Sequence, residues 1–242
     1  MRLHIVNPNT TQAMTDGIAA AARAAASAGC QITASQPAMG PVSIEGYYDE
    51  AFAVPGMLAC IAAAADADAH IIACFDDTGL DAARSLAAAP VIGIGEAAFH
   101  AASLVAGTFS VITTLGRSVP AIAHNLVRYG LATRCARVRA AEIPVLELDN
   151  PASDATARIS AQIEAAIAED RAEAIVLGCA GMAALAARLS LRHDIPVIDG
   201  VAAAVAFAEA LVRIGLRTSK RGGYASPRTK PYTGSFAGFA PS

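Results

Sequence analysis

The sequence predicts an α/β protein of two pseudo-symmetric lobes, each a parallel β-sheet flanked by helices, with a functional site in the cleft between them. Two observations lead to this fold class. Short apolar runs alternate with Ala-rich helical segments along the chain, as they do in parallel sheets covered by helices. The sequence 71-IIACFDDTG-79 also has a partner in 175-IVLGCAGM-182, so Cys74 and Cys179 lie 105 residues apart.

The surroundings of the two cysteines repeat at almost the same offset. The sequence 89-APVIG-93 matches 195-IPVID-199, and 4-HIVN-7 resembles 110-SVITT-114. Three correspondences in the same order indicate an internal duplication. We expect each copy to place its cysteine at the carboxyl end of a strand, where open parallel sheets bind ligands.

Composition argues against several classes of protein. A chain of 242 residues that is 55% hydrophobic and 16% charged has room for a sizeable core. A net charge of -3 without a long basic run argues against nucleic acid or an anionic membrane as a partner. No uncharged apolar run reaches the ~20 residues of a membrane-spanning helix. Five cysteines without a CxxC pair, in a chain whose first residues already form a strand, predict reduced thiols in the cytoplasm.

The first half is expected to form four strands and four helices. The segment 69–74 is apolar throughout, which is typical of a parallel strand covered on both faces. Thr10 and Thr11 are suited to cap the first helix. Residues 37–48 form a loop too long for a plain connector, which suggests a segment that faces a substrate. The expected strands are 3–6, 30–34, 69–74 and 91–94, and the expected helices are 12–28, 50–65, 80–88 and 96–105.

The second half repeats this alternation and ends in a different kind of segment. Gly130 is a plausible helix C-cap, and Ser153 or Asp154 is suited to begin the next helix. After residue 217, Gly, Pro, Ser and Thr dominate, and four aromatic residues are spaced among them. We expect an irregular tail held by these aromatics across the surface or onto a neighbour, with a disordered tail as the alternative. The expected strands are 108–114, 135–139, 174–179 and 197–198, and the expected helices are 119–129, 155–170, 182–192 and 201–214.

Several chemistries lack their sequence signals. The chain has no GxxxxGK[ST] phosphate loop, no GxGxxG after the first strand and no GxSxG elbow. Its five histidines are scattered without an HxxxH pair, so we expect no metal site. Pyridoxal phosphate requires a Schiff-base lysine, and the two lysines, Lys220 and Lys230, both lie in the tail. We therefore expect no cofactor.

After these exclusions, the two cysteines are the remaining candidates for a reactive site. One cysteine at a strand end is usually a small core residue, but two at equivalent points of a repeat favour a chemical role. Gly79, Gly178 and Gly181 leave backbone N–H groups and a helix N-terminus near the sulfurs, which is expected to stabilise a thiolate. Two facing thiols suit removal of a proton from one face of a carbon and its return to the other, with the carbanion held as an enolate by preformed donors. Cys74 and Cys179 are the candidate catalytic residues.

Longer motifs surround these residues, namely 7-NPNT-10, 43-SIEGYY-48, 73-ACFDDTG-79, 176-VLGCAGM-182, 196-PVIDG-200 and 236-FAGF-239. Together they resemble hydantoin racemases, which belong to the aspartate/glutamate racemase superfamily. The resemblance covers essentially the whole chain. It implies a cofactor-independent homo-oligomer that epimerises C5 of 5-monosubstituted hydantoins. It also implies that the last helix and tail return to the first lobe, which gives lobes of residues 1–96 with 206–242 and of residues 97–205.

The implied substrate explains further candidate residues. A hydantoin ring is neutral and planar, so its pocket needs no arginine to hold a carboxylate. The backbone of Gly178, Ala180 and Gly181 would let N–H groups approach the ring carbonyls. Phe75 would contribute its N–H and its ring, although packing in the core is an equal alternative for this side chain. The candidate side-chain contacts are Asn7, Ser43, Thr113 and Thr114.

Other functions remain open at this stage. Allantoin racemases share both cysteine motifs, but 76-DDTG-79 differs from the Gly-Asp-Pro-Gly loop variant of the family and favours hydantoins. Decarboxylation of malonates in the same fold uses one cysteine, so the presence of two argues against it. A non-enzymatic bilobal protein that binds a small molecule is the remaining alternative, with cysteines that are inert or form a redox disulfide.

Overall fold

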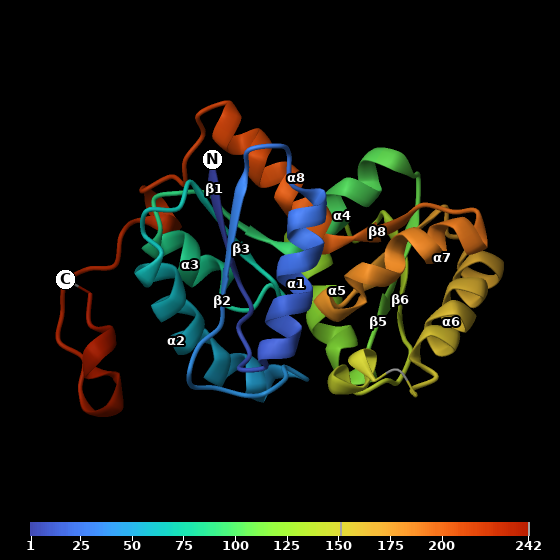
Figure 1. The fold of residues 1–242 in the computed structure, drawn as a ribbon, viewed down its shortest axis with the longest axis horizontal. Helices are drawn as coiled ribbons and strands as arrows, with labels where there is room; N and C mark the ends of the chain where they lie inside the picture. Colours follow the sequence, from blue (N-terminus) through green and yellow to red (C-terminus); the bar gives the residue numbers. More distant parts are fainter. Residues whose placement is uncertain (151, 242) are drawn as a thin grey trace.

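The computed structural model describes residues 1–150 and 152–241 and contains two four-stranded sheets (Figure 1). The first sheet consists of β1 (Arg2–Val6), β2 (Gln31–Ser35), β3 (Ala69–Ile72) and β4 (Val91–Gly93). The second consists of β5 (Phe109–Thr113), β6 (Cys135–Ala140), β7 (Ala174–Gly178) and β8 (Val197–Asp199). All neighbouring strands are parallel, in the orders β2-β1-β3-β4 and β6-β5-β7-β8. The same order in both halves agrees with the predicted duplication, and the predicted fold class is confirmed.

Helices connect the strands and cover both sheets. They are α1 (Gln12–Ala25), α2 (Tyr47–Ala63), α3 (Leu80–Leu86), α4 (Ile94–Val105), α5 (Val119–Arg128), α6 (Ala155–Asp170), α7 (Ala186–His193) and α8 (Gly200–Arg213). Short 3-10 helices occupy Gly116–Ser118, Val145–Asp149, Ala180–Leu185, Gly222–Tyr224 and Gly234–Phe239. In the part of the chain that the structure describes, no helix combines the length and apolar character needed to cross a bilayer.

The largest core lies between the two sheets. Alternate side chains of β1 divide between two layers: Leu3 and Ile5 point to this central core, whereas Val6 points to the layer under α2 and α3. Phe99 of α4 and Val205 of α8 fill the space between the sheets, as the position of both helices in Figure 1 indicates. Each such side chain stabilises the fold by about 1.5–3 kcal/mol when fully buried.

The two central helices cross between the lobes. Helix α4 follows the first sheet but packs against β7 of the second, and α8 follows the second sheet but packs against β3 and β4 of the first. The helices start in contact, because a Cβ atom on Gly200 would lie 2.6 Å from the carbonyl oxygen of Ile94. The lobe boundaries expected from the sequence, 96/97 and 205/206, fall inside these two helices, and the division stays a prediction.

Three helix boundaries differ from the expected ones by three residues or more. Helix α1 ends at Ala25 rather than at residue 28, because the backbone N–H and hydroxyl of Ser27 bind the carboxylate of Glu209 on α8. Helix α2 starts at Tyr47 rather than at residue 50, since its N-cap is Gly46 with a φ of 129°, a conformation that favours glycine. The helix expected over 182–192 begins as a 3-10 turn, and α7 proper starts only at Ala186.

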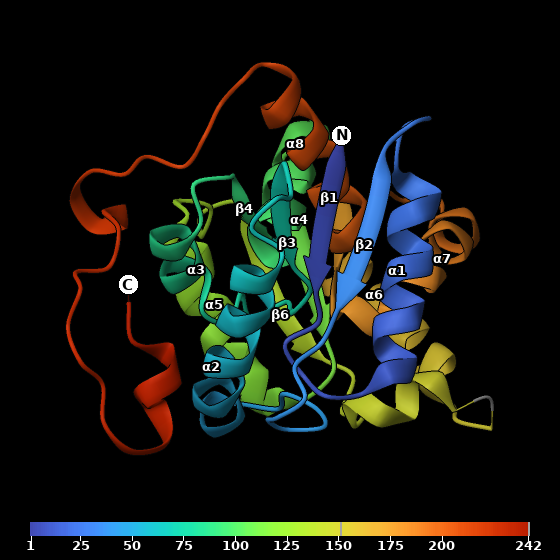
Figure 2. The ribbon, with the colours of Figure 1, turned by 60° about the vertical axis from the view of Figure 1, so that its left-hand side comes forward.

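The tail has two parts. Lys220 donates through Nζ to the carbonyl oxygens of Arg84 and Ser85 at the end of α3, and the Tyr224 hydroxyl donates to the Asp81 carboxylate. The ammonium group there also interacts favourably with the negative end of the helix. Beyond these contacts, residues 226–241 run apart from α2 and α3 (Figures 1 and 2).

Candidate active site

The two cysteines singled out in the sequence line one cavity. Cys74 follows β3 and Cys179 follows β7, so both lie where the strands of their sheets end. The cavity is lined by Asn7, Pro8, Asn9, Met14, Ile44, Ala73, Cys74, Phe75, Asp76, Thr114, Ser118, Val145, Gly178, Cys179 and Ala180. Both copies of the duplicated unit therefore supply walls of a single site.

Five of the eight expected substrate contacts also line this cavity, namely Asn7, Phe75, Thr114, Gly178 and Ala180. The other three, Ser43, Thr113 and Gly181, are not among its walls. Thr113 is buried and donates through Oγ1 to the carbonyl oxygen of Gly178 at 3.2 Å, so it joins β5 to the end of β7. Next to Ser43, the side chain of Ile44 contributes to the cavity instead.

Two of the wall residues also have clear structural roles. The amide nitrogen of Asn7 donates to Asn9 Oδ1 at 2.8 Å and to Thr15 Oγ1 at 3.0 Å, which fixes the loop against α1. The ring of Phe75 is 3% exposed and meets Phe99 edge-on at 5.3 Å between centroids. Asn7 and Phe75 therefore shape the cavity by holding its walls in place.

The surroundings of Cys74 differ from what the sequence suggested. Burial raises the pKa of the Cys74 thiol, and the carboxyl groups of Asp76 and Glu50 raise it further. The Thr78 hydroxyl, 3.3 Å from the sulfur, and the backbone of Asp76 act in the opposite direction but do not outweigh burial. The stabilised thiolate expected at Cys74 is not what its surroundings favour, because α3 begins only at Leu80 and burial has the larger effect. Burial favours the thiol form of Cys74 over the thiolate.

Asp76 is a wall residue that the sequence reasoning missed. Burial raises the pKa of its carboxyl group to about 7, and the carboxylates of Glu50 and Asp77 add to this effect. Among the described residues that line the cavity, Asp76 is the only carboxylic acid, and there is no lysine, arginine or histidine. A site of this composition suits an uncharged ligand. The signal for Asp76 was its position two residues after Cys74 within a motif already noted.

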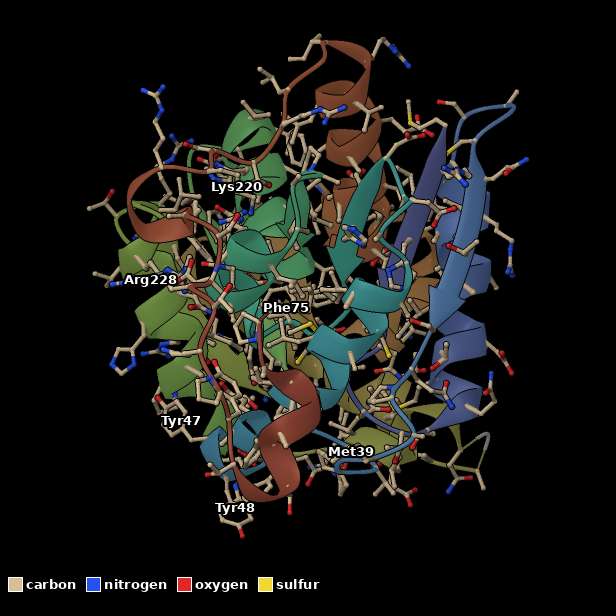
Figure 3. The ribbon with its side chains drawn as sticks, turned by 90° about the vertical axis from the view of Figure 1, so that its left-hand side faces the viewer. Met39, Tyr47, Tyr48, Phe75, Lys220 and Arg228 are labelled. Atoms are coloured by element: carbon tan, nitrogen blue, oxygen red, sulfur yellow. The ribbon has the colours of Figure 1, made fainter. Side chains whose placement is uncertain are left out.

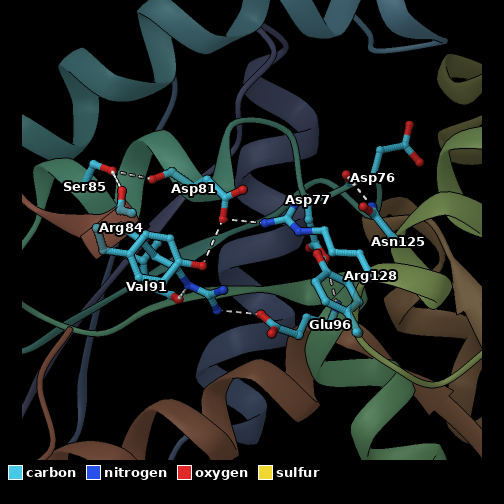
Figure 4. A network of polar contacts seen from close by, with 12 residues as sticks. Asp76, Asp77, Asp81, Arg84, Ser85, Val91, Glu96, Asn125 and Arg128 are labelled. Atoms are coloured by element: carbon cyan, nitrogen blue, oxygen red, sulfur yellow. Dashed lines mark hydrogen bonds and ion pairs between the residues drawn. The ribbon is translucent and has the colours of Figure 1, made fainter. Parts of the chain in front are cut away.

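Asp77, the next residue, holds the Cys74 loop in place, and Figure 4 shows it within a network of polar contacts. Its carboxylate accepts hydrogen bonds from the backbone N–H groups of Gly95 at 3.0 Å and Glu96 at 2.8 Å, and from the Tyr129 hydroxyl at 2.7 Å. It thereby caps the N-terminus of α4. Burial raises the pKa of Asp77 to about 7, whereas the three donors lower it.

Gly93 explains how Asp77 reaches this position. A Cβ atom at Gly93 would lie 2.0 Å from Asp77 Oδ1, so the carboxylate occupies the space that a side chain at 93 would fill. At the equivalent position of the second half, Asp199 caps its own helix and accepts from Val201 at 2.9 Å and Ala202 at 3.0 Å. The cap of α4 is therefore supplied by the loop that carries Cys74.

Other missed wall residues come from segments distant in sequence. Ser118 and Val145, both in 3-10 turns, belong to the second half, whereas Asn9, Ile44 and Met14 of α1 belong to the first. The Glu45 carboxylate accepts from the Val145 backbone N–H at 3.0 Å and joins the two loops beside the cavity. Within the described residues, no group of three or more His, Cys, Asp or Glu side chains is arranged to hold a metal ion.

Comparison with known proteins agrees with this geometry. The family described as Asp/Glu/Hydantoin racemase matches residues 3–208. The chain belongs to this family. It is 50% identical to a hydantoin racemase of Rhizobium meliloti over 97% of this chain and 98% of that one. It is 42% identical to a hydantoin racemase of Pseudomonas sp. (strain NS671) over 99% of this chain and 97% of that one.

A solved structure shows the same architecture over the full length. The allantoin racemase from Klebsiella pneumoniae superposes with a TM-score of 0.97 at 47% identity, covering 100% of both chains. The fold of this chain is therefore that of a racemase of known structure.

Proposed function

We propose that this protein is a cofactor-independent racemase of 5-monosubstituted hydantoins, which moves a proton at C5 with Cys74 and Cys179 as the two bases. One observation carries the proposal: two cysteines from equivalent turns of a duplicated unit line the same cavity. The relatives that share 50% and 42% identity are hydantoin racemases, which supports the substrate class. The absence of a cationic wall residue among those described fits a neutral ring.

The proton transfer needs one thiolate and one thiol. In the direction that starts from the thiol form of Cys74, Cys179 takes the C5 proton and the electron pair of the C–H bond moves into the ring as an enolate. Cys74 then returns a proton to the opposite face of C5, and the two sulfurs have exchanged protonation states. We assign enolate stabilisation to backbone N–H groups around Gly178 and Ala180 and to the carboxyl group of Asp76 in its protonated form.

The remaining candidate contacts follow from the same proposal. Asn7, Phe75 and Thr114 shape the pocket around the ring, whereas Ser43, Thr113 and Gly181 act from behind its walls. We further propose that the protein is a cytoplasmic homo-oligomer. The division into lobes of 1–96 with 206–242 and of 97–205 is part of this proposal.

Hydrogen exchange tests the mechanism. An optically pure 5-substituted hydantoin is incubated with the enzyme in D2O, and deuterium at C5 is measured together with loss of optical rotation. We expect both to occur with the wild type. Cys74→Ser and Cys179→Ser should each abolish racemisation, and each should retain exchange with only one enantiomer. Full racemisation by both single variants would falsify the two-base mechanism. Cys60→Ser serves as a control, because Cys60 lies on α2 outside the cavity walls.

Allantoin is the second candidate substrate. The structure that superposes with a TM-score of 0.97 is an allantoin racemase, which is the observation in its favour. The two ligands share the five-membered ring and differ in the C5 substituent. Turnover of optically pure hydantoins and allantoin, followed side by side by circular dichroism, separates the two. A higher kcat/KM for allantoin would overturn the assignment to hydantoins.

A binding protein without chemistry is the remaining alternative. Under that reading, alkylation of the cysteines removes no activity and no deuterium enters C5 of any ligand. Binding of a hydantoin without exchange, measured by calorimetry and by NMR in D2O, would establish it. Exchange that is lost in proportion to alkylation would exclude it.

A further inference from the structure

The C-terminal segment leaves the body of its own chain. Residues 226–241, called the arm below, run apart from α2 and α3 in both Figures 1 and 2. Most of the arm is exposed, including the ring of Phe236 at 52%. Among the residues that the structure describes, no hydrogen bond joins the arm to the rest of the chain. The segment before the arm is held by contacts of Lys220 and Tyr224 with α3 and by hydrogen bonds of Thr218 to the carbonyl oxygens of Ala88 and Ala89.

The arm nevertheless has a defined course. It contains the 3-10 turn Gly234–Phe239, with the rings of Phe236 and Phe239 6.1 Å apart. The arm makes up about 7% of the 242-residue chain, so the TM-score of 0.97 over both full chains requires most of it to superpose on the K. pneumoniae structure. A terminal segment without a surface to pack on does not keep one path in water. A surface outside the chain therefore sets its path.

A matching apolar surface lies at the start of α2. Five large side chains there, called the α2 patch, are between 56% and 77% exposed: Met39, Val42, Tyr47, Tyr48 and Phe52. The rings of Tyr48 and Phe52 are in contact, with centroids 4.9 Å apart. Figure 3 shows Met39, Tyr47 and Tyr48 at one end of the face along which the arm also runs. Exposed aromatic clusters of this kind mark protein interfaces.

The charges of arm and body are opposite. Residues 217–241 contain five basic residues and no acidic one. Because the net charge of the whole chain is -3, the rest of the chain carries a net charge of -8. Within the arm, Arg228 and Lys230 are the basic residues. The first turn of α2, inside the patch, carries the partly exposed Asp49. An acidic residue at the edge of the patch and a basic arm favour association at low salt.

We propose that the arm of one copy lies across the α2 patch of a second copy of this chain, and that the exchange is reciprocal about a twofold axis. This names the contact surface of the homo-oligomer proposed above. Arm and patch lie on the same side of the molecule. In a twofold dimer, each arm therefore covers the patch of the other copy, and no arm or patch is left for a third copy. Because the arm runs apart from its own α2, the partner's patch is the surface that it meets.

Molar mass by light scattering tests the proposal without reference to any reaction. The full chain is compared with a chain that ends at Ala225, with Phe236→Ser/Phe239→Ser in the arm and with Tyr48→Ser/Phe52→Ser in the patch. Leu104→Ser/Leu191→Ser is the control, since both leucines are exposed, at 76% and 87%, on other helices. We expect the truncated chain, the arm variant and the patch variant to dissociate at concentrations about tenfold higher than the full chain does, and the control to match the full chain.

Circular dichroism is used to check that each variant is folded. A cross-linking assay identifies the chain on which the arm lies. A photo-cross-linking residue replaces Phe236 in unlabelled chains, which are mixed with 15N-labelled chains. Adducts between an unlabelled arm peptide and a labelled peptide containing Tyr48 support the exchange. A monomeric full chain, arm and patch variants with unchanged mass, or adducts only within one chain would each overturn it. Because molar mass is measured and not activity, a result against the arm exchange leaves the racemase proposal standing. A result against racemase activity likewise leaves the arm exchange standing.

Discussion

The contacts of Asp77 lead to a prediction about Gly93→Asp, which should destabilise the wild type but stabilise the Asp77→Ala variant. Asp77→Ala removes the cap of α4, which costs about 0.5–2 kcal/mol. It also leaves the Tyr129 hydroxyl without its acceptor, which costs ~1–3 kcal/mol if the group is shielded from water. Since Tyr129 is partly exposed, we expect a total loss of about 2–4 kcal/mol in the free energy of unfolding.

Gly93→Asp alone should also destabilise the wild type. Its Cβ atom would lie 2.0 Å from Asp77 Oδ1, and two carboxylates would compete for one helix N-terminus. In the Asp77→Ala variant, the Asp77 carboxylate no longer fills the space beside Gly93, and the N–H groups of Gly95 and Glu96 lack their acceptor. The new carboxylate at position 93 can then occupy that space and accept from them. Gly93 already has the extended backbone of an N-cap, with φ of -84°. We therefore expect Gly93→Asp to recover about 1 kcal/mol there.

Urea denaturation followed by circular dichroism, at one protein concentration, measures all four proteins of this cycle. Asp154→Ala is a matched control, because Asp154 stands at the N-cap of α6 without a side-chain bond to the helix and should cost less than about 0.5 kcal/mol. The reasoning is refuted if Gly93→Asp changes stability with the same sign in both backgrounds.

Three other predictions follow from the site and the central helices. Asp76→Asn removes a negative charge that raises the pKa of Cys74, so alkylation of Cys74 should become about tenfold faster by mass spectrometry; a slower reaction would contradict this. Because burial raises the pKa of Asp76 from 3.8 to about 7, its contribution to stability is complete below about pH 4 and lost as the pH rises to 7. Denaturation of Asp76→Asn should show a flatter pH dependence over that range, by at most ~4 kcal/mol; an unchanged slope would argue against it. Gly200→Ala should lower the unfolding free energy by about 1–3 kcal/mol because its Cβ meets the Ile94 carbonyl, whereas Gly17→Ala, with open space, should raise it by up to ~1 kcal/mol. Equal effects of the two glycine changes in denaturation would sink that argument.

The sequence was informative where signals are local. The apolar run before Cys74 and its repeat before Cys179 are each contained within nine residues, so strand, loop and duplication could be predicted together. The cap of α4 could not, because Asp77 and Gly93 are sixteen residues apart and nothing in either segment indicates that the carboxylate of one fills the space of the other.

The chemistry around the sulfur was also beyond local reasoning. Glycines and a nearby helix suggested a thiolate at Cys74, but the pKa of the thiol depends on burial, on Asp76 and on the more distant Glu50 of α2. Ser118 and Val145 likewise reach the cavity from loops without a motif. Wall residues that follow strands were within reach of the sequence, whereas those brought in by packing of distant loops were not.

The crossing of α4 and α8 means that neither half of this duplicated chain is a finished protein. Cut at the midpoint, the first half would lack α8 over the inner face of β3 and β4. It would also lack Tyr129, so Asp77, in the loop that carries Cys74, would lose a donor that the other half provides. Duplication and fusion here have produced two pieces that fold as one, and a substitution at Tyr129 removes a hydrogen bond from the cysteine loop of the opposite half.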